Sequence, residues 1–187
     1  PWQGVLGHLG EMRSPTQYPL AKDVVRWQGE PVAVVVANKR AVAEDASELV
    51  EIDYEDLDAQ LDMETAMDKS TKVIHDDLGN NLFWTRTVNQ GDVSEAFKQS
   101  HIVEEVTLDF ARHTGVTLET RAIVADWDSS EEKMTVYHNG QAPHMMQSII
   151  AKHLNLSEGL VRIISCDVGG SFGIKVHVYP DEMVTVA

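Results

Sequence analysis

The stretch VRIISCDVGGSFGIK (residues 161–175) joins an apolar run to a glycine-rich loop. Its β-branched residues up to Val168 are typical of a buried strand, so the glycines follow directly after a strand. Glycines at such a point either form a tight turn or let backbone N–H groups approach a planar or phosphorylated ligand closely. The stretch alone leaves both interpretations open, and the plain turn is the commoner of the two.

The composition is that of a soluble globular protein. The 187 residues are enough for one domain, or two small ones, with a sizeable core. Thirty acidic residues against 15 basic ones give a formal net charge of −15, which argues against contacts with nucleic acid phosphates. No apolar run approaches the roughly 20 residues of a membrane span. We therefore predict neither a nucleic-acid partner nor a membrane span.

The single cysteine and the two ends of the sequence predict the redox setting and the extent of the chain. Cys166 is the single cysteine, so no internal disulfide or four-cysteine cluster can form within this chain. Cys166 stands in an apolar predicted strand, where a small buried thiol is far commoner than a nucleophile, so we expect a buried thiol. We predict a reducing, cytoplasmic setting. The chain begins without Met or a signal-peptide pattern and ends in the helix-like EMVTVA, so we expect a fragment of a longer protein.

The first part of the sequence predicts a compact α/β unit. Residues 31–37 form a β-branched run typical of a buried strand, residues 40–50 have apolar positions at helical spacing, and residues 51–57 return to an extended pattern. The turn after the first strand, NKRA, lacks the glycine fingerprint of a dinucleotide site. Residues 58–92 are weakly patterned and predict a linker, with the boundary between the two units near residue 80.

The second part predicts helices alternating with strands. A short helix is expected within 91–100, capped by Asp92 or Ser94, and a longer one follows Gln141 with Pro143 in its first turn. The longer helix should bury one apolar face made of Met145, Ile149, Ile150 and Leu154. Strands with an antiparallel meander among them are predicted at 101–111, 120–128, 134–140 and 160–168.

Few side chains point to chemistry by themselves. Eight histidines are present, but none has the spacing of a zinc site, and we predict no metal bound directly by side chains of this chain. Gln141 stands between a predicted strand and a predicted helix. Its amide can donate to a ligand oxygen, or it can cap the helix or a turn.

Taken in order, several segments resemble one known family. The first part resembles the small α/β hammerhead domain of the xanthine dehydrogenase/aldehyde oxidase family, and the second resembles the start of that family's molybdopterin-binding region. The closest pattern is that of carbon monoxide dehydrogenase-type and aldehyde-oxidising large chains. The segments are GEPVAVVVA with ELVEIDYEDL, GDVSEAF, LETRAIVADWD after His113, GQAPH, and DVGGSFGIK with YPDE.

The resemblance implies an α+β fold: a hammerhead domain over residues 1–80, followed by the beginning of a mixed α/β molybdopterin-binding domain over residues 81–187. It implies a molybdenum–molybdopterin cofactor, in the cytosine dinucleotide form, which hydroxylates a carbon centre with oxygen from water. Gln141 would hydrogen-bond an oxo ligand of the metal. The backbone of Gly170, Ser171, Phe172 and Gly173 would line the cofactor, with Phe172 beside the metal centre.

Two positions depart from the family pattern, and one further element follows it. Ser171 stands where the family has the middle glycine of GGGFG, a small-for-small change. Val176 stands where purine-hydroxylating members carry a glutamate, which argues against purine substrates. Glu119 and Arg121, with His113, fall in the family's H-x5-E-x-R element, where we expect a buried Glu–Arg pair that braces the loop.

The resemblance therefore predicts part of the catalytic subunit of a molybdenum hydroxylase acting on a small aldehyde, N-heterocycle or carbon monoxide. The family's catalytic glutamate lies far downstream, so we expect no catalytic residue in this fragment and no activity from it alone. FAD and [2Fe-2S] clusters would sit on an FAD-binding subunit and a small iron–sulfur subunit, in a dimer of heterotrimers. The alternative is a non-catalytic scaffold or interaction module with the same fold and no cofactor.

Overall fold

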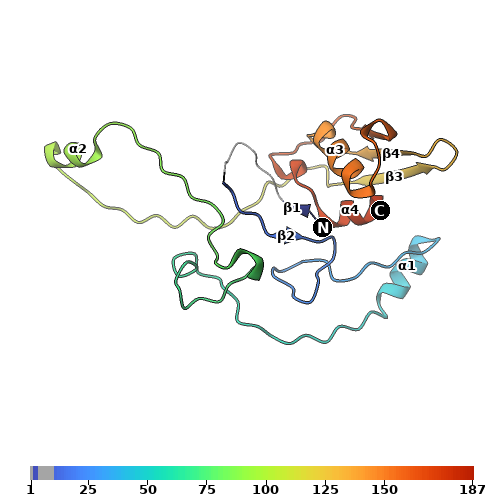
Figure 1. The fold of residues 1–187 in the computed structure, drawn as a ribbon, viewed down its shortest axis with the longest axis horizontal. Helices are drawn as coiled ribbons and strands as arrows, with labels where there is room; N and C mark the ends of the chain where they lie inside the picture. Colours follow the sequence, from blue (N-terminus) through green and yellow to red (C-terminus); the bar gives the residue numbers. More distant parts are fainter. Residues whose placement is uncertain (1, 4–10) are drawn as a thin grey trace.

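The computed structural model describes residues 2–3 and 11–187, and the C-terminal third holds most of the regular structure (Figure 1). Long extended segments connect the remaining elements. The strands are β1 (Trp2–Gln3), β2 (Thr16–Gln17), β3 (Ile123–Asp128), β4 (Lys133–His138) and β5 (Val161–Ile164). The helices are α1 (Arg40–Ser47), α2 (Val93–Gln99), α3 (Pro143–Leu154) and α4 (Pro180–Val186), with 3₁₀ turns η2 (Asp76–Leu78), η3 (Glu158–Leu160) and η4 (Ile174–Val176).

Three strands form the main sheet, in the order β3-β4-β5. β3 and β4 pair antiparallel, from Ile123 opposite His138 to Asp128 opposite Lys133, which confirms the predicted hairpin. β5 pairs parallel to β4, with Met134 opposite Val161. A parallel pair needs a crossover connection, and α3 supplies it. The predicted final strand is shorter than expected, because β5 ends at Ile164 and the chain then turns toward the glycine loop.

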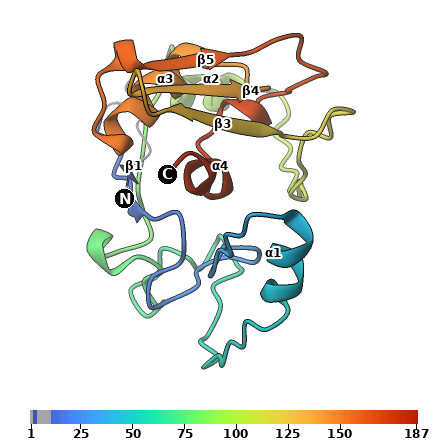
Figure 2. The same ribbon diagram turned by 90° about the vertical axis from the view of Figure 1, so that its right-hand side faces the viewer.

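One face of this sheet carries the core. Alternate residues of β4 are buried, and Val136 has no exposed surface. Helices α3 and α4 supply the other buried members, and Figure 2 shows α4 lying against the sheet beside β3. The predicted apolar face of α3 was wrong at one residue: Ile150 is buried and Ile149 and Leu154 pack against the core, but Met146 is buried in place of Met145, which is 38% exposed. The core is Met134, Val136, Met146, Ile150, Ala151, Val161, Met183 and Val186.

The other predicted helices are also present. Asp92 caps α2, since its Oδ1 accepts a hydrogen bond of 2.9 Å from the backbone N–H of Glu95. The last residues form α4, with Pro180 in its first turn. Neither α1 nor α2 has a buried residue, so both rest on local interactions alone. No helix among the described residues is long and apolar enough to cross a membrane.

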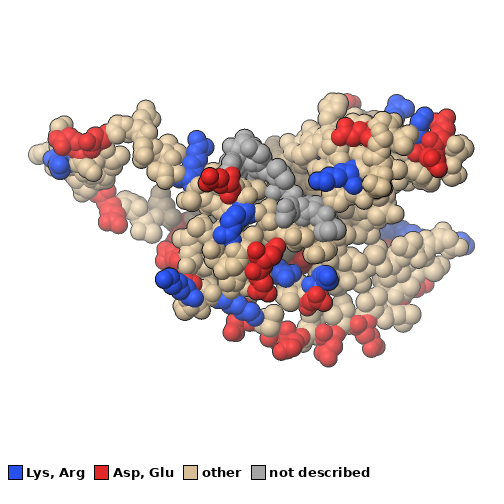
Figure 3. Space-filling model, in the orientation of Figure 1, with Lys and Arg blue, Asp and Glu red and all other residues tan. Residues whose placement is uncertain are grey.

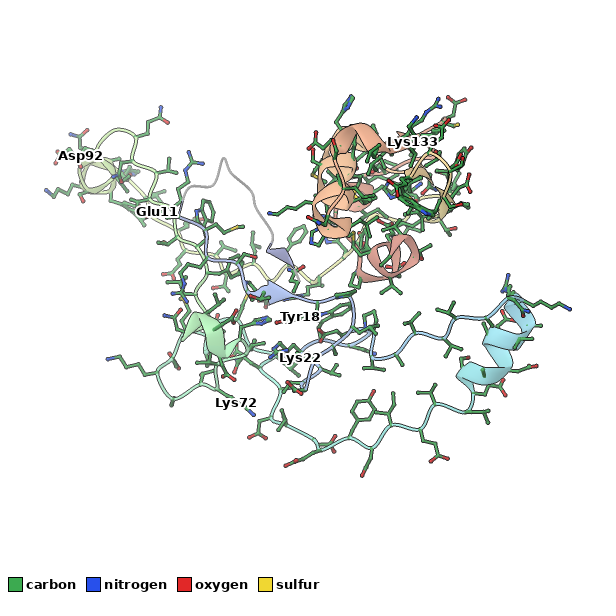
Figure 4. The ribbon with its side chains drawn as sticks, turned by 45° about the vertical axis from the view of Figure 1, so that its right-hand side comes forward. Glu11, Tyr18, Lys22, Lys72, Asp92 and Lys133 are labelled. Atoms are coloured by element: carbon green, nitrogen blue, oxygen red, sulfur yellow. The ribbon has the colours of Figure 1, made fainter. Side chains whose placement is uncertain are left out.

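The segments predicted as strands at 31–37, 51–57 and 101–111 run extended without a ladder partner in the described chain. Val36, on 31–37, is 87% exposed, and Leu108, on 101–111, is 83% exposed. Figure 4 shows side chains projecting to both sides of these segments, while Tyr18 and Lys22 lie together, with Lys22 Nζ 5.9 Å from the ring centre. The accessible surface is 15271 Å², against about 9,000 Å² for a compact monomer of this mass.

The extended segments also carry much of the acidic charge. Acidic side chains gather along the segment that follows α1 (Figure 3). These segments leave apolar residues such as Leu49, 81% exposed, and Leu57, 51% exposed, open to solvent among the acids. The compact unit predicted for 31–57 is therefore not formed by these residues alone.

Candidate functional site

The glycine loop lies between β5 and η4. Gly170 N donates to Val168 O at 2.9 Å and Ile174 N donates to Ser171 O at 3.0 Å, so the segment contains two successive turns. Gly170 and Gly173 have φ of 95° and 87°, a backbone region that favours glycine. Phe172 between them has a φ of 50°, which strains a residue with a side chain.

The glycines are needed for different reasons. A Cβ on Gly169 would lie 2.5 Å from the Cβ of Glu119, so this position is closed by packing. A Cβ on Gly173 would meet no described atom within 4 Å, so this position faces open space and is restricted only by its φ. The loop is thus closed by packing at Gly169 and open at Gly173. It combines the two interpretations of its sequence, a tight turn and a backbone surface that a ligand can approach.

Glu119 braces the loop. Its Oε2 accepts a hydrogen bond of 2.8 Å from Gly169 N and one of 2.6 Å from Lys175 Nζ. The Lys175 side chain is 1% exposed, so the ion pair is buried at the cationic end. The hydrogen bond from Lys175, followed by that from Gly169 N–H, lowers the pKa of Glu119. The loop is therefore tied at both ends to a single carboxylate.

Arg121 does not pair with Glu119, and the predicted Glu–Arg brace was wrong in its partner. Arg121 instead binds Asp181 Oδ2 at 3.1 Å and Glu182 Oε1 at 2.8 Å, and its guanidinium lies 3.7 Å from the Tyr179 ring centre. Glu119 and Arg121 have different partners because the chain bends at residues 118–119, so these two side chains need not point to the same face. Sequence reasoning missed Lys175, although a lysine inside an apolar loop signals a buried partner.

A buried pair lies at the end of β4. His138 and Glu182 are 5% and 3% exposed, and His138 Nε2 is 3.2 Å from Glu182 Oε2, an ion-pair distance without hydrogen-bond alignment. The His138 ring packs under the turn that leads to Gln141. A Cβ on Gly140 would lie 2.3 Å from His138 Cε1, so only glycine fits there.

Gln141 is joined to the loop through its backbone and its side chain. Its N–H donates to Lys175 O at 3.1 Å, and its Oε1 accepts a hydrogen bond from Ser171 Oγ. Its Nε2 donates to no residue within 2–3 or 11–187. The helix-capping alternative fails, because α3 begins after Ala142 without a side-chain cap.

The five residues predicted for the site lie in this one place: Gln141 beside the loop, and Gly170, Ser171, Phe172 and Gly173 within it. Phe172 is 77% exposed, which leaves an apolar ring open beside the Gln141–Ser171 contact. Over the described chain, the backbone N–H groups of Ser171, Phe172 and Gly173 have no acceptor. Successive N–H groups with left-handed residues among them favour a polar or anionic ligand.

Two other candidate residues, Cys166 and His113, make no described hydrogen bond or ring contact with the site residues. Cys166 is exposed, so the prediction of a buried thiol was wrong, because β5 ends two residues before it. His113 is exposed and contacts Phe110 and the carbonyl of Ala111. No group of three or more His, Cys, Asp or Glu side chains that could hold a metal ion occurs in the described ranges.

Comparison with known proteins gives two family matches. Residues 74–187 match the molybdopterin cofactor-binding domain, and residues 4–58 match the a/b hammerhead domain of aldehyde oxidase and xanthine dehydrogenase. The nicotine 6-hydroxylase large subunit of Paenarthrobacter nicotinovorans is 36% identical over 88% of this chain and 20% of its own length. The carbon monoxide dehydrogenase large chain of Hydrogenophaga pseudoflava is 29% identical over 89% of this chain and 22% of its own length.

A solved structure agrees with these matches. Quinoline 2-oxidoreductase from Pseudomonas putida 86 superposes with a TM-score of 0.85 at 30% identity, covering 99% of this chain and 23% of that one. The chain therefore spans about a fifth of the length of the relatives it matches.

Proposed function

The chain belongs to the molybdopterin cofactor-binding family of aldehyde oxidase and xanthine dehydrogenase large subunits, and on that premise we propose that it is part of the catalytic subunit of a molybdenum hydroxylase. The observation that carries the proposal is the junction of Gln141 with the glycine loop. There an amide donor without a described protein partner lies against a loop in which the N–H groups of Ser171, Phe172 and Gly173 have no acceptor among the described residues.

The residues present fit a molybdopterin cofactor. Gly173 leaves open space where a Cβ would stand, whereas a Cβ on Gly170 would meet the Phe172 ring at 3.3 Å. The exposed Phe172 ring offers an apolar contact, and the free Gln141 amide offers a donor. A bulky ligand rich in oxygen acceptors matches this combination of open glycine backbone and unused donors.

When bound, molybdenum–molybdopterin supplies hydroxylation of a carbon centre with oxygen from water. The residues of this chain would bind and orient it. Gln141 Nε2 would donate to an oxygen of the cofactor, and the backbone from Gly170 to Gly173 would line it. Lys175 and Glu119 would hold the loop in position, because the Glu119 carboxylate binds Gly169 N at one end of it and the buried Lys175 side chain at the other.

The proposal extends to the rest of the enzyme. The cofactor would be the cytosine dinucleotide form, and FAD and [2Fe-2S] clusters would be carried by partner subunits in a dimer of heterotrimers in the cytoplasm. Within these 187 residues, the single cysteine cannot supply the four thiolates that a cluster needs. Within the chain, the proposed boundary between the hammerhead and molybdopterin-binding parts is near residue 80.

For the substrate, we favour an aromatic N-heterocycle over an aldehyde or carbon monoxide. The similarity to a nicotine hydroxylase at 36% identity and to a quinoline oxidoreductase at a TM-score of 0.85 supports this order. Assaying the three substrate classes with the intact complex distinguishes them, and oxidation of carbon monoxide alone would contradict our preference.

The metal is the first test. The full-length chain, produced with its partner subunits in a host that makes the cofactor, should contain stoichiometric molybdenum by elemental analysis. A well-folded complex without molybdenum would overturn the proposal and favour the non-catalytic module.

Gln141→Ala tests the role of the amide. The variant should keep its fold and molybdenum but turn over roughly ten- to a hundredfold more slowly, because it loses a hydrogen bond to a charged group. Gln99→Ala on α2 is the matched control and should keep full turnover. Unchanged turnover of Gln141→Ala at full molybdenum loading would show that this amide does not act on the cofactor.

A further inference from the structure

We propose that Ser171 is a positioning residue that sets the direction of the Gln141 amide. Its hydroxyl holds Oε1, so that the Nε2 donors face the ligand site. This inference rests on the proposed function, in which Gln141 contacts the cofactor. It adds a role for a side chain that otherwise only lines the loop.

The hydroxyl of Ser171 makes two described contacts with different directions. Lys175 N lies 3.3 Å from Ser171 Oγ and can only donate, so the oxygen accepts there. The single hydroxyl proton then goes to Gln141 Oε1, which can only accept. Together the contacts form a directed chain, from the Lys175 backbone through Ser171 to the amide oxygen.

This chain determines which end of the amide remains available. The last torsion of a glutamine side chain is broad and roughly twofold, so an exposed amide can present either its oxygen or its nitrogen. With Oε1 held by Ser171, the nitrogen is the free end, and it donates to no residue in the described part of the chain. A donor rather than an acceptor is therefore presented to the ligand.

The loop gives the hydroxyl a fixed base. Gln141 N donates to Lys175 O at 3.1 Å, and Lys175 N donates to Ser171 Oγ at 3.3 Å, so both residues of the side-chain contact are also held by the Lys175 backbone. Lys175 in turn is held by Glu119 at 2.6 Å. Ser171 does not have a positive φ, unlike Phe172 and Gly173 on its C-terminal side, so a residue with a side chain is unstrained at this position.

The test uses the full-length enzyme in its complex, with Ser171→Ala, Ser171→Thr and Gln141→Met, and with the double variant Ser171→Ala/Gln141→Met. Readouts are molybdenum content, the electron paramagnetic resonance spectrum of the partly reduced metal, kcat and KM. Ser148→Ala is the matched control, because its hydroxyl bonds only within α3, to His144 O at 3.3 Å.

Ser171→Ala should keep its molybdenum, lower kcat about two- to tenfold with little change in KM, and alter the resonance spectrum in the same sense as Gln141→Met. Ser171→Thr should restore both. In the Gln141→Met background, Ser171→Ala should have no further effect, since the hydroxyl acts through the amide.

Three results would overturn the inference: an unchanged kcat and spectrum in Ser171→Ala, loss of molybdenum from it, or an equal effect in both backgrounds. The last would show that the hydroxyl acts on the cofactor directly. A wild-type complex without molybdenum would instead remove the proposed function itself, so the two failures are distinguishable.

Discussion

The two regions of the molecule differ in what their apolar residues contact. In residues 120–187, a three-stranded sheet packs its apolar face on α3 and α4, and Ile150 is 1% exposed. In residues 24–112, extended segments pass α1 and α2 without covering them, and Ile102 is 70% exposed. An extended run becomes stable only when a second strand and a covering layer satisfy its backbone and its apolar side chains. The candidate site lies in the region that has both.

The largest expected effect comes from one substitution made in both regions. Ile150→Ala should lower the free energy of unfolding by about 2–5 kcal/mol, because it opens a cavity between α3 and the sheet. Ile102→Ala should change it by no more than about 0.5 kcal/mol, because the side chain is exposed. Chemical denaturation of the 187-residue chain, followed by circular dichroism, measures both. Equal effects would show that the segment at 101–111 is packed.

This comparison also explains which features could be predicted from sequence. Helices α2 and α3 were predictable because their start signals, Asp92 and Pro143, act within a few residues. The β3–β4 hairpin was predictable because its partners adjoin in sequence. The segment at 31–37 has an equally good strand pattern, but pairing depends on distant residues that no local pattern specifies.

In the site too, features set by neighbouring residues could be predicted from sequence, and contacts between distant residues could not. The ordered motifs selected Gln141 and the glycine loop, which the structure brings into contact, and their role toward a cofactor stays a prediction. The partner of Glu119 was not predictable, because Lys175 lies 56 positions away while Arg121 lies close by in sequence. The buried face of α3 was misjudged only at Met145, since 3.6-residue periodicity leaves Met145 and Met146 on adjoining faces.

A smaller effect is expected where a glycine is closed by packing. Gly140→Ala should destabilise the C-terminal unit by about 1–3 kcal/mol, because its Cβ would meet the buried His138 ring. Gly159→Ala is the matched control within the same unit, since its nearest atom would be Ser157 Oγ at 3.9 Å. Thermal unfolding of both variants measures the difference. If Gly140→Ala were as stable as Gly159→Ala, the His138 ring would not be fixed beneath this turn.

The Glu119–Lys175 contact should appear in the pH dependence of stability. The pKa of Glu119 is lowered in the folded state by the Lys175 hydrogen bond, so its stabilising contribution is complete above about pH 4.5 and is lost as the pH falls further. The free energy of unfolding should therefore decrease less steeply below that pH in Glu119→Gln than in the wild type. Denaturation curves at a series of acidic pH values measure the slope.

Glu44→Gln is the control from the other region. Glu44 pairs with Arg40 at 2.7 Å, but both side chains are exposed and α1 has no buried residue. This substitution should leave the slope unchanged, because an exposed pair on an unpacked helix contributes little. Equal slopes in the wild type and Glu119→Gln would mean that the carboxylate does not brace the loop.

The smallest effect on global stability is expected at α2. Asp92→Ala removes the cap on Glu95 N–H, which contributes about 0.5–2 kcal/mol to a helix end. Because α2 buries no residue, this loss should reduce the helical signal of 93–99 without shifting the unfolding transition of residues 120–187. Amide exchange at 93–99 measures the first and circular dichroism the second. A shift of the main transition would show that α2 packs on the C-terminal unit, and the contrast between the two regions would then fail at this helix.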